Sequence, residues 1–257
     1  MCTIAILIDR LAQVPVAVAA NRDELYDRPA TAPVALGEGR VGGRDDVLGG
    51  SWLAFTGDGR FAAVTNQREP MLGRAPRSRG ALVLGLLDAG DREAMRRYAA
   101  AIDPTAYASA NLVFGDASGV ELVYARRAGT LERVELPRGI TVVANHRIDA
   151  PGQPKLARLR AHLEPLATWD DLVRAAPSAL GDHALPDREV PGTIVEGAPI
   201  TTVHALHALC IHTPRYGTRS ATIAALVPGG VAALRWADGA PCVTPFVDAR
   251  PLLGSAP

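Results

Sequence analysis

The sequence lacks an excess of charge of either sign. Among its 257 residues, lysine plus arginine and aspartate plus glutamate number 27 each. Proteins drawn to nucleic acid or to anionic membranes carry a basic surplus. The balance therefore argues against a nucleic-acid partner and favours a small neutral or amphipathic one.

Long hydrophobic runs and a basic leader are also missing. The longest apolar runs, such as AILI and ALVLGLL, fall far short of the ~20 residues that cross a bilayer. No basic-then-apolar leader precedes them. We therefore expect no transmembrane segment and a cytoplasmic location.

Cysteine and lysine are scarce. Cys2, Cys210 and Cys242 are odd in number and lack CxxC spacing, which argues against a disulfide framework and against a structural zinc site. Lysine occurs once, at Lys155, in a chain whose other cationic side chains are arginines. We expect free thiols, no bound metal and no cofactor, and the single lysine stands out.

Short apolar runs separated by turn signals are abundant. Hydrophobic residues make up 48% of the chain, which is enough for a continuous core. Glycine-containing turns at 57–59 and 229–230 separate several runs and indicate antiparallel hairpins. The runs that predict strands are CTIAILI, PVAVAA, SWLAFT, RFAAVT, NLVFG, GVELVYA, ITVVA, LCIHT, SATIAALV and GVAALRW.

Helical patterns fall between groups of these runs. Apolar residues recur at spacings of three to four in the segments 78–90, 91–102 and 154–166. A fourth helical segment, 168–176, begins at Thr168, which is followed three residues later by Asp171, as in a capping box. Because strands and helices are segregated in groups, the pattern predicts an α+β fold and not a parallel doubly wound sheet.

One domain is expected to span residues 1–257, since no segment resembles a domain linker. The proline-rich stretch 185–199 is interpreted as a loop that could form a flap over a site.

Cys2 directly follows the initiator methionine. Methionine aminopeptidases remove Met1 when the second residue is small, which would place a free α-amine beside the thiol. An α-amine titrates near ~7.7 to 8.0, so at neutral pH part of it is free base and can accept the proton of the thiol. The alternative is that Cys2 is a small buried hydrophobe.

Four polar residues follow the second predicted strand: Asn21, Arg22, Asp23 and Glu24. At the end of a buried strand such residues form an exposed turn or line a site, and Asn and Asp commonly start turns. If the first two apolar runs pair as a hairpin, the end of the second run lies beside the start of the first. This geometry would place the four residues next to Cys2.

Other candidates lie at strand ends. Gly50 and Trp52 belong to a GGSW segment whose flexible backbone could approach a ligand closely, or simply make a turn. Asn66 and Asn145 each stand where an apolar run ends, where an amide could hold an oxyanion or start a turn.

The segment 211–223 carries Tyr216 and Arg219 between two apolar runs, with a polar hairpin loop as the alternative. His204, His207 and His212 raise the question of metal or haem ligation. Their spacings of three and five give weak support for it, and we interpret them as surface or core histidines.

Together these pieces resemble the NRDE family, also called the transport and Golgi organisation 2 family. The motifs follow family order from residue 1 to about residue 226. They are MC, AANRDE with YDRP, GGSW, AAVTN, SRG, NLVFGD, AN with PK, LPD and YGTRSATI. The resemblance implies an N-terminal-nucleophile hydrolase-like fold, with four layers in which two antiparallel sheets lie between helices.

The resemblance also implies site residues. In the similar cysteine hydrolases, an N-terminal cysteine attacks an amide or thioester and an aspartate binds its α-amine. Asp23 matches this aspartate, Asn145 matches an oxyanion-binding asparagine, and Asn66 and Arg219 match a second asparagine and a late arginine. The hydrolases carry an arginine three residues before the aspartate, where this chain has Ala20. Arg22 is the candidate replacement, although strand alternation is expected to turn it to the other face.

Two main functions follow from the resemblance. The first is an amidohydrolase or acyltransferase that forms a Cys2 thioester with a small acyl amide or acyl thioester. The second is non-catalytic binding of acyl-CoA, lipid or haem, since animal members are linked to lipid metabolism and haem handling. A third possibility is a member that lost activity and acts through protein contacts. The sequence leaves the oligomeric state open, including a homo-oligomer.

Overall fold

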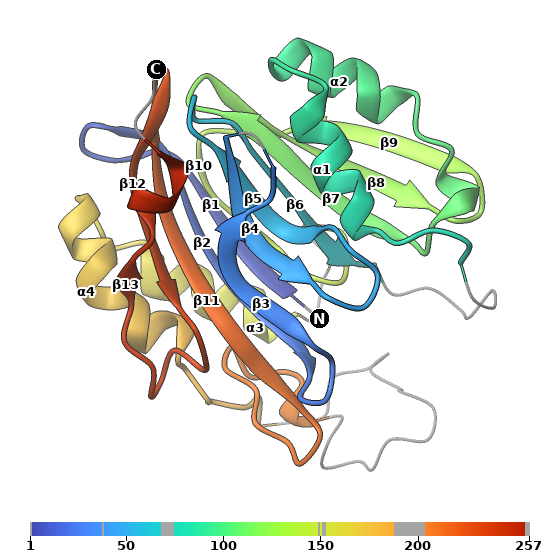
Figure 1. The fold of residues 1–257 in the computed structure, drawn as a ribbon. Helices are drawn as coiled ribbons and strands as arrows, with labels where there is room; N and C mark the ends of the chain where they lie inside the picture. Colours follow the sequence, from blue (N-terminus) through green and yellow to red (C-terminus); the bar gives the residue numbers. More distant parts are fainter. Residues whose placement is uncertain are drawn as a thin grey trace.

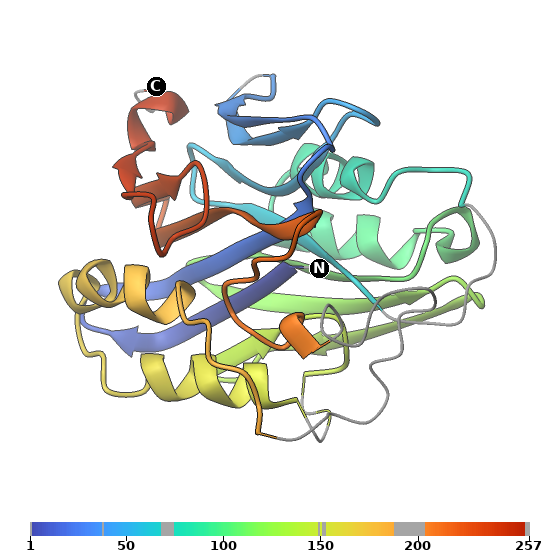
Figure 2. The same cartoon turned by 90° about the horizontal axis from the view of Figure 1, so that it is seen from below.

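Two antiparallel sheets stack between two pairs of helices (Figure 1 and Figure 2). The computed structural model describes residues 2–37, 39–67, 75–148, 150, 153–187 and 204–254. The loop expected over 185–199 lies outside these residues from position 188 onward.

The first sheet has six strands, in the order β10-β1-β2-β11-β12-β13. Their bounds are β1 Cys2–Leu11, β2 Val14–Leu25, β10 Gly139–Val143, β11 Tyr216–Val227, β12 Gly230–Ala237 and β13 Val247–Asp248. The second sheet has seven strands, in the order β3-β4-β5-β6-β7-β8-β9. Their bounds are β3 Ala30–Ala35, β4 Arg40–Asp45, β5 Ser51–Thr56, β6 Phe61–Asn66, β7 Ala110–Asp116, β8 Gly119–Arg126 and β9 Thr130–Glu135.

Two helices cover the outer face of each sheet (Figure 1). Helices α1 (Gly80–Asp88) and α2 (Arg92–Ala100) pack on the seven-stranded sheet, and α3 (Pro154–Leu163) and α4 (Trp169–Leu180) pack on the six-stranded sheet. Short 3-10 helices span Pro104–Ala106 and Arg250–Leu253. The α+β class and the four-layer arrangement expected from the sequence are confirmed.

Strand β1 shows why the apolar runs are nearly continuous. Ile4 and Ile6 point between the two sheets, whereas Ala5 and Leu7 point to the layer of α3 and α4. Both faces of the strand are therefore buried, and both need apolar side chains. The same alternation holds over residues 4–8 of β1 and 16–20 of β2, and a register shift between Ile8 and Leu11 interrupts it.

The predicted elements agree with the structure in most places. All four helices form, and Thr168 and Asp171 make the expected capping box at the start of α4. The run LCIHT is not a strand; only an isolated bridge joins His212 to Gly217. Strands β3, β4, β9 and β13 were not predicted. β9 and β13 are largely exposed, β3 is mostly only partly buried, and two glycines and polar residues interrupt β4.

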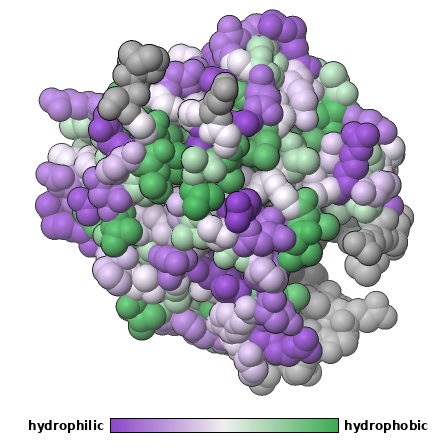
Figure 3. Space-filling view, in the orientation of Figure 1, coloured by the Kyte–Doolittle hydropathy of each residue, from purple (hydrophilic) through white to green (hydrophobic). Residues whose placement is uncertain are grey.

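The surface in Figure 3 mixes hydrophilic and hydrophobic residues across the face drawn. Within the described ranges, no helix combines the length and the apolar character that a membrane crossing requires.

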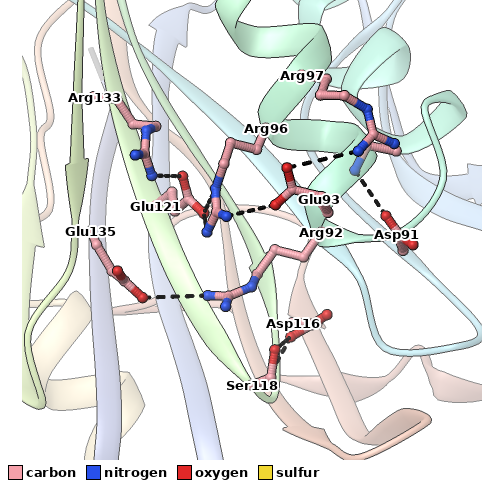
Figure 4. Close-up of polar contacts among 11 residues, drawn as sticks. Asp91, Arg92, Glu93, Arg96, Arg97, Asp116, Ser118, Glu121, Arg133 and Glu135 are labelled. Atoms are coloured by element: carbon pink, nitrogen blue, oxygen red, sulfur yellow. Dashed lines mark hydrogen bonds and ion pairs between the residues drawn. The ribbon is translucent and has the colours of Figure 1, made fainter.

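A buried carboxylate fastens α2 to the seven-stranded sheet (Figure 4). The side chain of Glu121 on β8 is fully buried and accepts hydrogen bonds from Arg96 on α2 (2.8 Å) and from Arg133 on β9 (2.9 Å). Burial would raise the pKa of Glu121, but the hydrogen bonds from the two arginines outweigh it and hold this pKa below its usual value. The two cations thus compensate for removing the carboxylate from water.

We expect Glu121→Gln to lower the free energy of unfolding by about 1.5–3 kcal/mol at pH 7, because charge-assisted hydrogen bonds are lost from a buried site. The matched control is Glu93→Gln, which removes an exposed partner of the same Arg96 and should change stability by less than about 0.5 kcal/mol. Urea unfolding measures both values. Because the folded-state pKa of Glu121 is lowered, the difference from wild type should fade as pH falls below about 4.3. Equal losses in the two variants would contradict this assignment.

Candidate active site

A pocket of about 350 Å³ opens beside the first strand. Its wall includes the Cys2 side chain, the end of β2, parts of β5 and β6, and the segment that enters α1. The described residues that line it are Cys2, Arg22, Asp23, Glu24, Arg28, Asp45, Leu48, Ser51, Trp52, Val64, Asn66, Ala75, Arg77, Ser78, Arg79, Gly80 and Ala108.

The β1–β2 hairpin places Cys2 in this wall. Cys2 lies directly opposite Arg22 in the antiparallel register, so the predicted pairing of the first two runs is confirmed. The N-terminal end of β1 lies well inside the outline of the molecule in both ribbon views (Figure 1 and Figure 2). The hairpin therefore brings the thiol and the NRDE segment to one side of the pocket.

Arg22 corrects one expectation from the sequence. Its side chain was expected on the face opposite the thiol, but directly paired residues of an antiparallel sheet share a face. Ala20 and Arg22 are two residues apart in one strand and also share a face, so Arg22 can reach the region that an arginine at position 20 would occupy. Its guanidinium carbon lies 4.1 Å from the ring centroid of Trp52, which adds a cation–π contact.

Opposing influences act on the Cys2 thiol. Burial raises the pKa of Cys2 above its usual value, and the negative charge of Asp23 raises it further. The backbone of Asp23 and the charge of Arg22 act in the opposite direction. The net pKa of Cys2 is raised, so this environment by itself keeps the thiol protonated near neutral pH.

Arg79 is a second cation near the thiol and was not singled out as a site residue. It lines the pocket, burial lowers its pKa, and the charge of Cys2 opposes that effect. Its guanidinium donates a hydrogen bond of 3.2 Å to the Ser109 carbonyl oxygen. Its only sequence signal was the SRG motif at 78–80.

Gly50 explains why the GGSW and SRG segments meet. It has a positive φ of 82°, and an added Cβ would collide with the backbone of Gly80. This close approach brings the start of α1 against β5, where Ser51 and Trp52 line the pocket. Gly50 thus acts through backbone packing and does not itself appear in the lining.

Asp23 lies in a buried polar network on the helix side of the sheet. Its carboxylate accepts a hydrogen bond from Thr218 Oγ1 (2.6 Å) and pairs with Lys155 Nζ (3.4 Å). Tyr216 donates its hydroxyl to the Asp23 carbonyl oxygen at 2.9 Å. Lys155, the single lysine of the chain, was noticed in the sequence but not assigned to the site. Its charge offsets the cost of burying the carboxylate.

Asn66 and Asn145, each expected at a strand end, are in contact. Asn145 donates an amide hydrogen to the Asn66 backbone carbonyl at 2.8 Å, and Asn66 lines the pocket. A third amide, Asn111, was missed: its fully buried side chain donates to Thr65 Oγ1 (3.1 Å) and to the Ala144 carbonyl oxygen (2.8 Å). Asn111 thereby connects the end of β6 to the residue that follows β10.

The remaining sequence candidates occupy different places. Asn21 points away from the pocket and donates to the carbonyl oxygens of Leu180 (2.8 Å) and Leu209 (3.0 Å). Arg219 lies outside the described lining and donates to the carbonyl oxygens at positions 25 and 26. Glu24 does line the pocket and lies 3.8 Å from Arg28.

The charges of the lining suit an anion better than a metal cation. Each lining carboxylate has a cationic partner, Lys155 for Asp23 and Arg28 for both Glu24 and Asp45. Arg22 and Arg79, in contrast, form no ion pair with any carboxylate that the structure describes. No histidine occurs among the described lining residues, and Cys2 is the one side chain among them of a type that ligates haem iron.

Solved structures with a similar fold include two variants of a bacterial hydrolase. The chain aligns with a mutant of conjugated bile acid hydrolase from Clostridium perfringens at a TM-score of 0.55 and 8% identity, over 100% of this chain and 95% of that one. A second variant of the same hydrolase gives a TM-score of 0.58 at 8% identity, over 99% and 95% of the two chains. At this identity the likeness establishes the fold alone.

Sequence relatives give the family. A Bos taurus protein named Transport and Golgi organization protein 2 homolog is 30% identical over 224 residues, 80% of each chain, and its Homo sapiens counterpart is 27% identical over 226 residues with the same coverage. The family model described as Transport and Golgi organisation 2 matches residues 1–230. The chain therefore belongs to the Transport and Golgi organisation 2 family.

Proposed function

We propose that the chain is an N-terminal-cysteine amidohydrolase or acyltransferase that acts on a small acyl amide or acyl thioester. The observation that carries the proposal is the register of the β1–β2 hairpin, which sets Cys2 in a pocket wall with buried Asp23 next to its partner. Free thiol chemistry of this kind fits a reducing compartment such as the cytoplasm.

The proposed first step begins after removal of Met1. The α-amine of Cys2 takes the thiol proton, and the sulfur attacks the substrate carbonyl carbon. The C–N or C–S bond of the substrate then breaks, the leaving group takes the proton, and a Cys2 thioester remains. Water or an amine acceptor resolves the thioester and restores the thiol. Because burial raises the pKa of the thiol, the reaction needs a base beside the sulfur, and the α-amine supplies it. Asp23 is the group that would orient this amine.

The developing oxyanion needs hydrogen-bond donors. Asn66 lies at the pocket, and Asn145 holds the end of β6 through one of its two amide hydrogens, which leaves the second for an oxyanion. Arg22 lies beside the thiol and adds positive charge there. Asn145 itself is not among the described lining residues, so its proposed role rests on its contact with Asn66 and on its match to the family pattern.

The lining supports an amphipathic substrate. Trp52, Val64 and Leu48 supply apolar surface, and Leu48 is 52% exposed beside Val47, which is 51% exposed. Exposed apolar side chains next to a pocket suit an acyl group. Arg22 and Arg79 suit a negatively charged part of the same molecule.

A non-catalytic carrier for an acyl thioester or lipid is the second candidate. The raised pKa of the Cys2 thiol favours it, because a protonated thiol is a poor nucleophile. The same pocket would then bind the ligand through its apolar surface and arginines without forming a thioester.

Cys2 should carry a free amine and react selectively. We expect the intact mass of the folded protein to show loss of Met1, and a thiol-acylating β-lactone to add one label, mapped to Cys2. Cys2→Ala should lose that label, while Cys210 and Cys242 serve as internal comparisons. Retention of Met1, or equally fast labelling of the other two thiols, would refute the proposed enzymatic function. Tight binding of an acyl thioester by an unlabelled protein would instead support the carrier.

The rate of Cys2 acylation should rise with pH, because an ammonium cannot accept the thiol proton. A neighbouring carboxylate stabilises the ammonium and raises the amine pKa. We therefore expect Asp23→Asn to move the midpoint of the pH–rate profile to lower pH and to lower the plateau rate by roughly 10²-fold, since the amine loses its orienting partner. Asp116→Asn, on a turn outside the described pocket lining, should keep the wild-type profile. An unchanged midpoint in Asp23→Asn would remove Asp23 from this role.

A further inference from the structure

Four side chains with metal-binding atoms meet on the far side of the six-stranded sheet from the seven-stranded one. His183 follows α4, Cys210 and His212 precede β11, and Cys242 follows β12. Their ligand atoms all lie within 4.8 Å of one another. This group of side chains, named the four-ligand cluster, shares no residue with the pocket lining.

The distances within the cluster match those around a tetrahedral ion. Cys210 Sγ lies 3.7 Å from Cys242 Sγ and 3.6 Å from His212 Nε2, and His212 Nε2 lies 3.4 Å from Cys242 Sγ. Zinc binds sulfur at about 2.3 Å and imidazole nitrogen at about 2.0–2.1 Å, which at tetrahedral angles separates two sulfurs by about 3.8 Å and a sulfur from a nitrogen by about 3.6 Å. Three ligands therefore already stand at the corners that zinc requires.

His183 is oriented to supply the fourth corner. Its Nδ1 lies 3.0 Å from the Cys210 carbonyl oxygen, and because a carbonyl only accepts, Nδ1 carries the hydrogen. The lone pair of the ring is then on Nε2, which is the atom left to bind a metal. Histidine ligands commonly have such an outer partner for the second nitrogen. The His183 and His212 rings lie 5.0 Å apart between centroids, close enough to share one ion.

We propose that His183, Cys210, His212 and Cys242 form a structural zinc site. Two thiolates and two imidazoles are a ligand set that zinc prefers, and four protein ligands leave no open position for substrate. The sequence argued against zinc because the ligands lack CxxC spacing. The fold overrides that argument by joining three separate segments.

The site would brace the segment that supports Asp23. Ile211, between two of the ligands, donates its backbone N–H to Thr218 Oγ1 at 2.9 Å. Thr218 in turn donates to the Asp23 carboxylate at 2.6 Å. A metal that fixes Cys210 and His212 would therefore hold this chain of hydrogen bonds in place. The zinc proposal stands on the cluster geometry and does not depend on the proposed reaction.

The test uses the full chain, reduced and stripped of metal with a chelator. Cobalt(II) is titrated in as a spectroscopic substitute for zinc. We expect saturation at one ion per chain, with sulfur-to-cobalt charge-transfer absorption, the visible bands of a tetrahedral ion, and displacement by zinc. Cys242→Ser and His183→Ala should each weaken cobalt binding by at least ~10-fold. Cys2→Ser, which changes the third cysteine, is the matched control and should bind as wild type does.

A second measurement uses only the wild-type chain, so it does not require any variant to fold. Zinc should slow alkylation of Cys210 and Cys242 in the wild-type chain by at least ~10-fold and leave the rate at Cys2 unchanged, since a metal-bound thiolate is a poor nucleophile. Absence of a charge-transfer band, binding unaffected by Cys242→Ser, or no protection by zinc would overturn the proposal. A Cys210–Cys242 disulfide that persists after treatment with reductant, together with no uptake of metal, would also overturn the proposal.

Discussion

The register between β1 and β2 is the constraint on which the candidate site depends. Cys2 opposite Arg22 puts both side chains between the two sheets, and Asp23 then faces the helix layer. A slip of one residue would exchange the two faces, so that Ile4 and Ile6 would no longer meet the inter-sheet core. The hydrophobic packing that secures the hairpin therefore also sets the chemistry at its end.

Burial at this end acts in two directions. It raises the pKa of the Cys2 thiol, which disfavours the nucleophilic form, and it makes the charges of Arg22 and Asp23 more effective because less water screens them. The proposed reaction would therefore depend on a base placed beside the nucleophile and not on a thiol that is ionised in advance. Arg22, held against Trp52, is positioned to act on charge that develops there.

Buried polar groups connect the layers of the fold. Glu121 joins α2 to its sheet, Asp23 joins β2 to α3 through Lys155, and Asn111 joins the ends of β6 and β10. Each of these side chains is fully buried or nearly so and has hydrogen-bond or ionic partners, although the buried Oδ1 of Asn111 has none among the described residues. The four-ligand cluster is linked to the Asp23 network through Thr218, which accepts a hydrogen bond from Ile211 and donates one to Asp23.

By itself, the sequence determined the α+β class, the four helices and the β1–β2 hairpin, because helical spacing, turn residues and continuous apolar runs act over short stretches of chain. The expected hairpin also put Cys2 next to Asp23, and the family resemblance added Asn66. Only the tertiary structure decided the partner of Asp23, the position of Arg79 in the pocket and the meeting of Cys210 with Cys242. Lys155 and Asp23 are 132 positions apart in the sequence, and Cys210 and Cys242 are 32 apart. The position of Arg79 depends on how the segment before α1 packs. No local pattern encodes such distances, since they are set by how the layers stack.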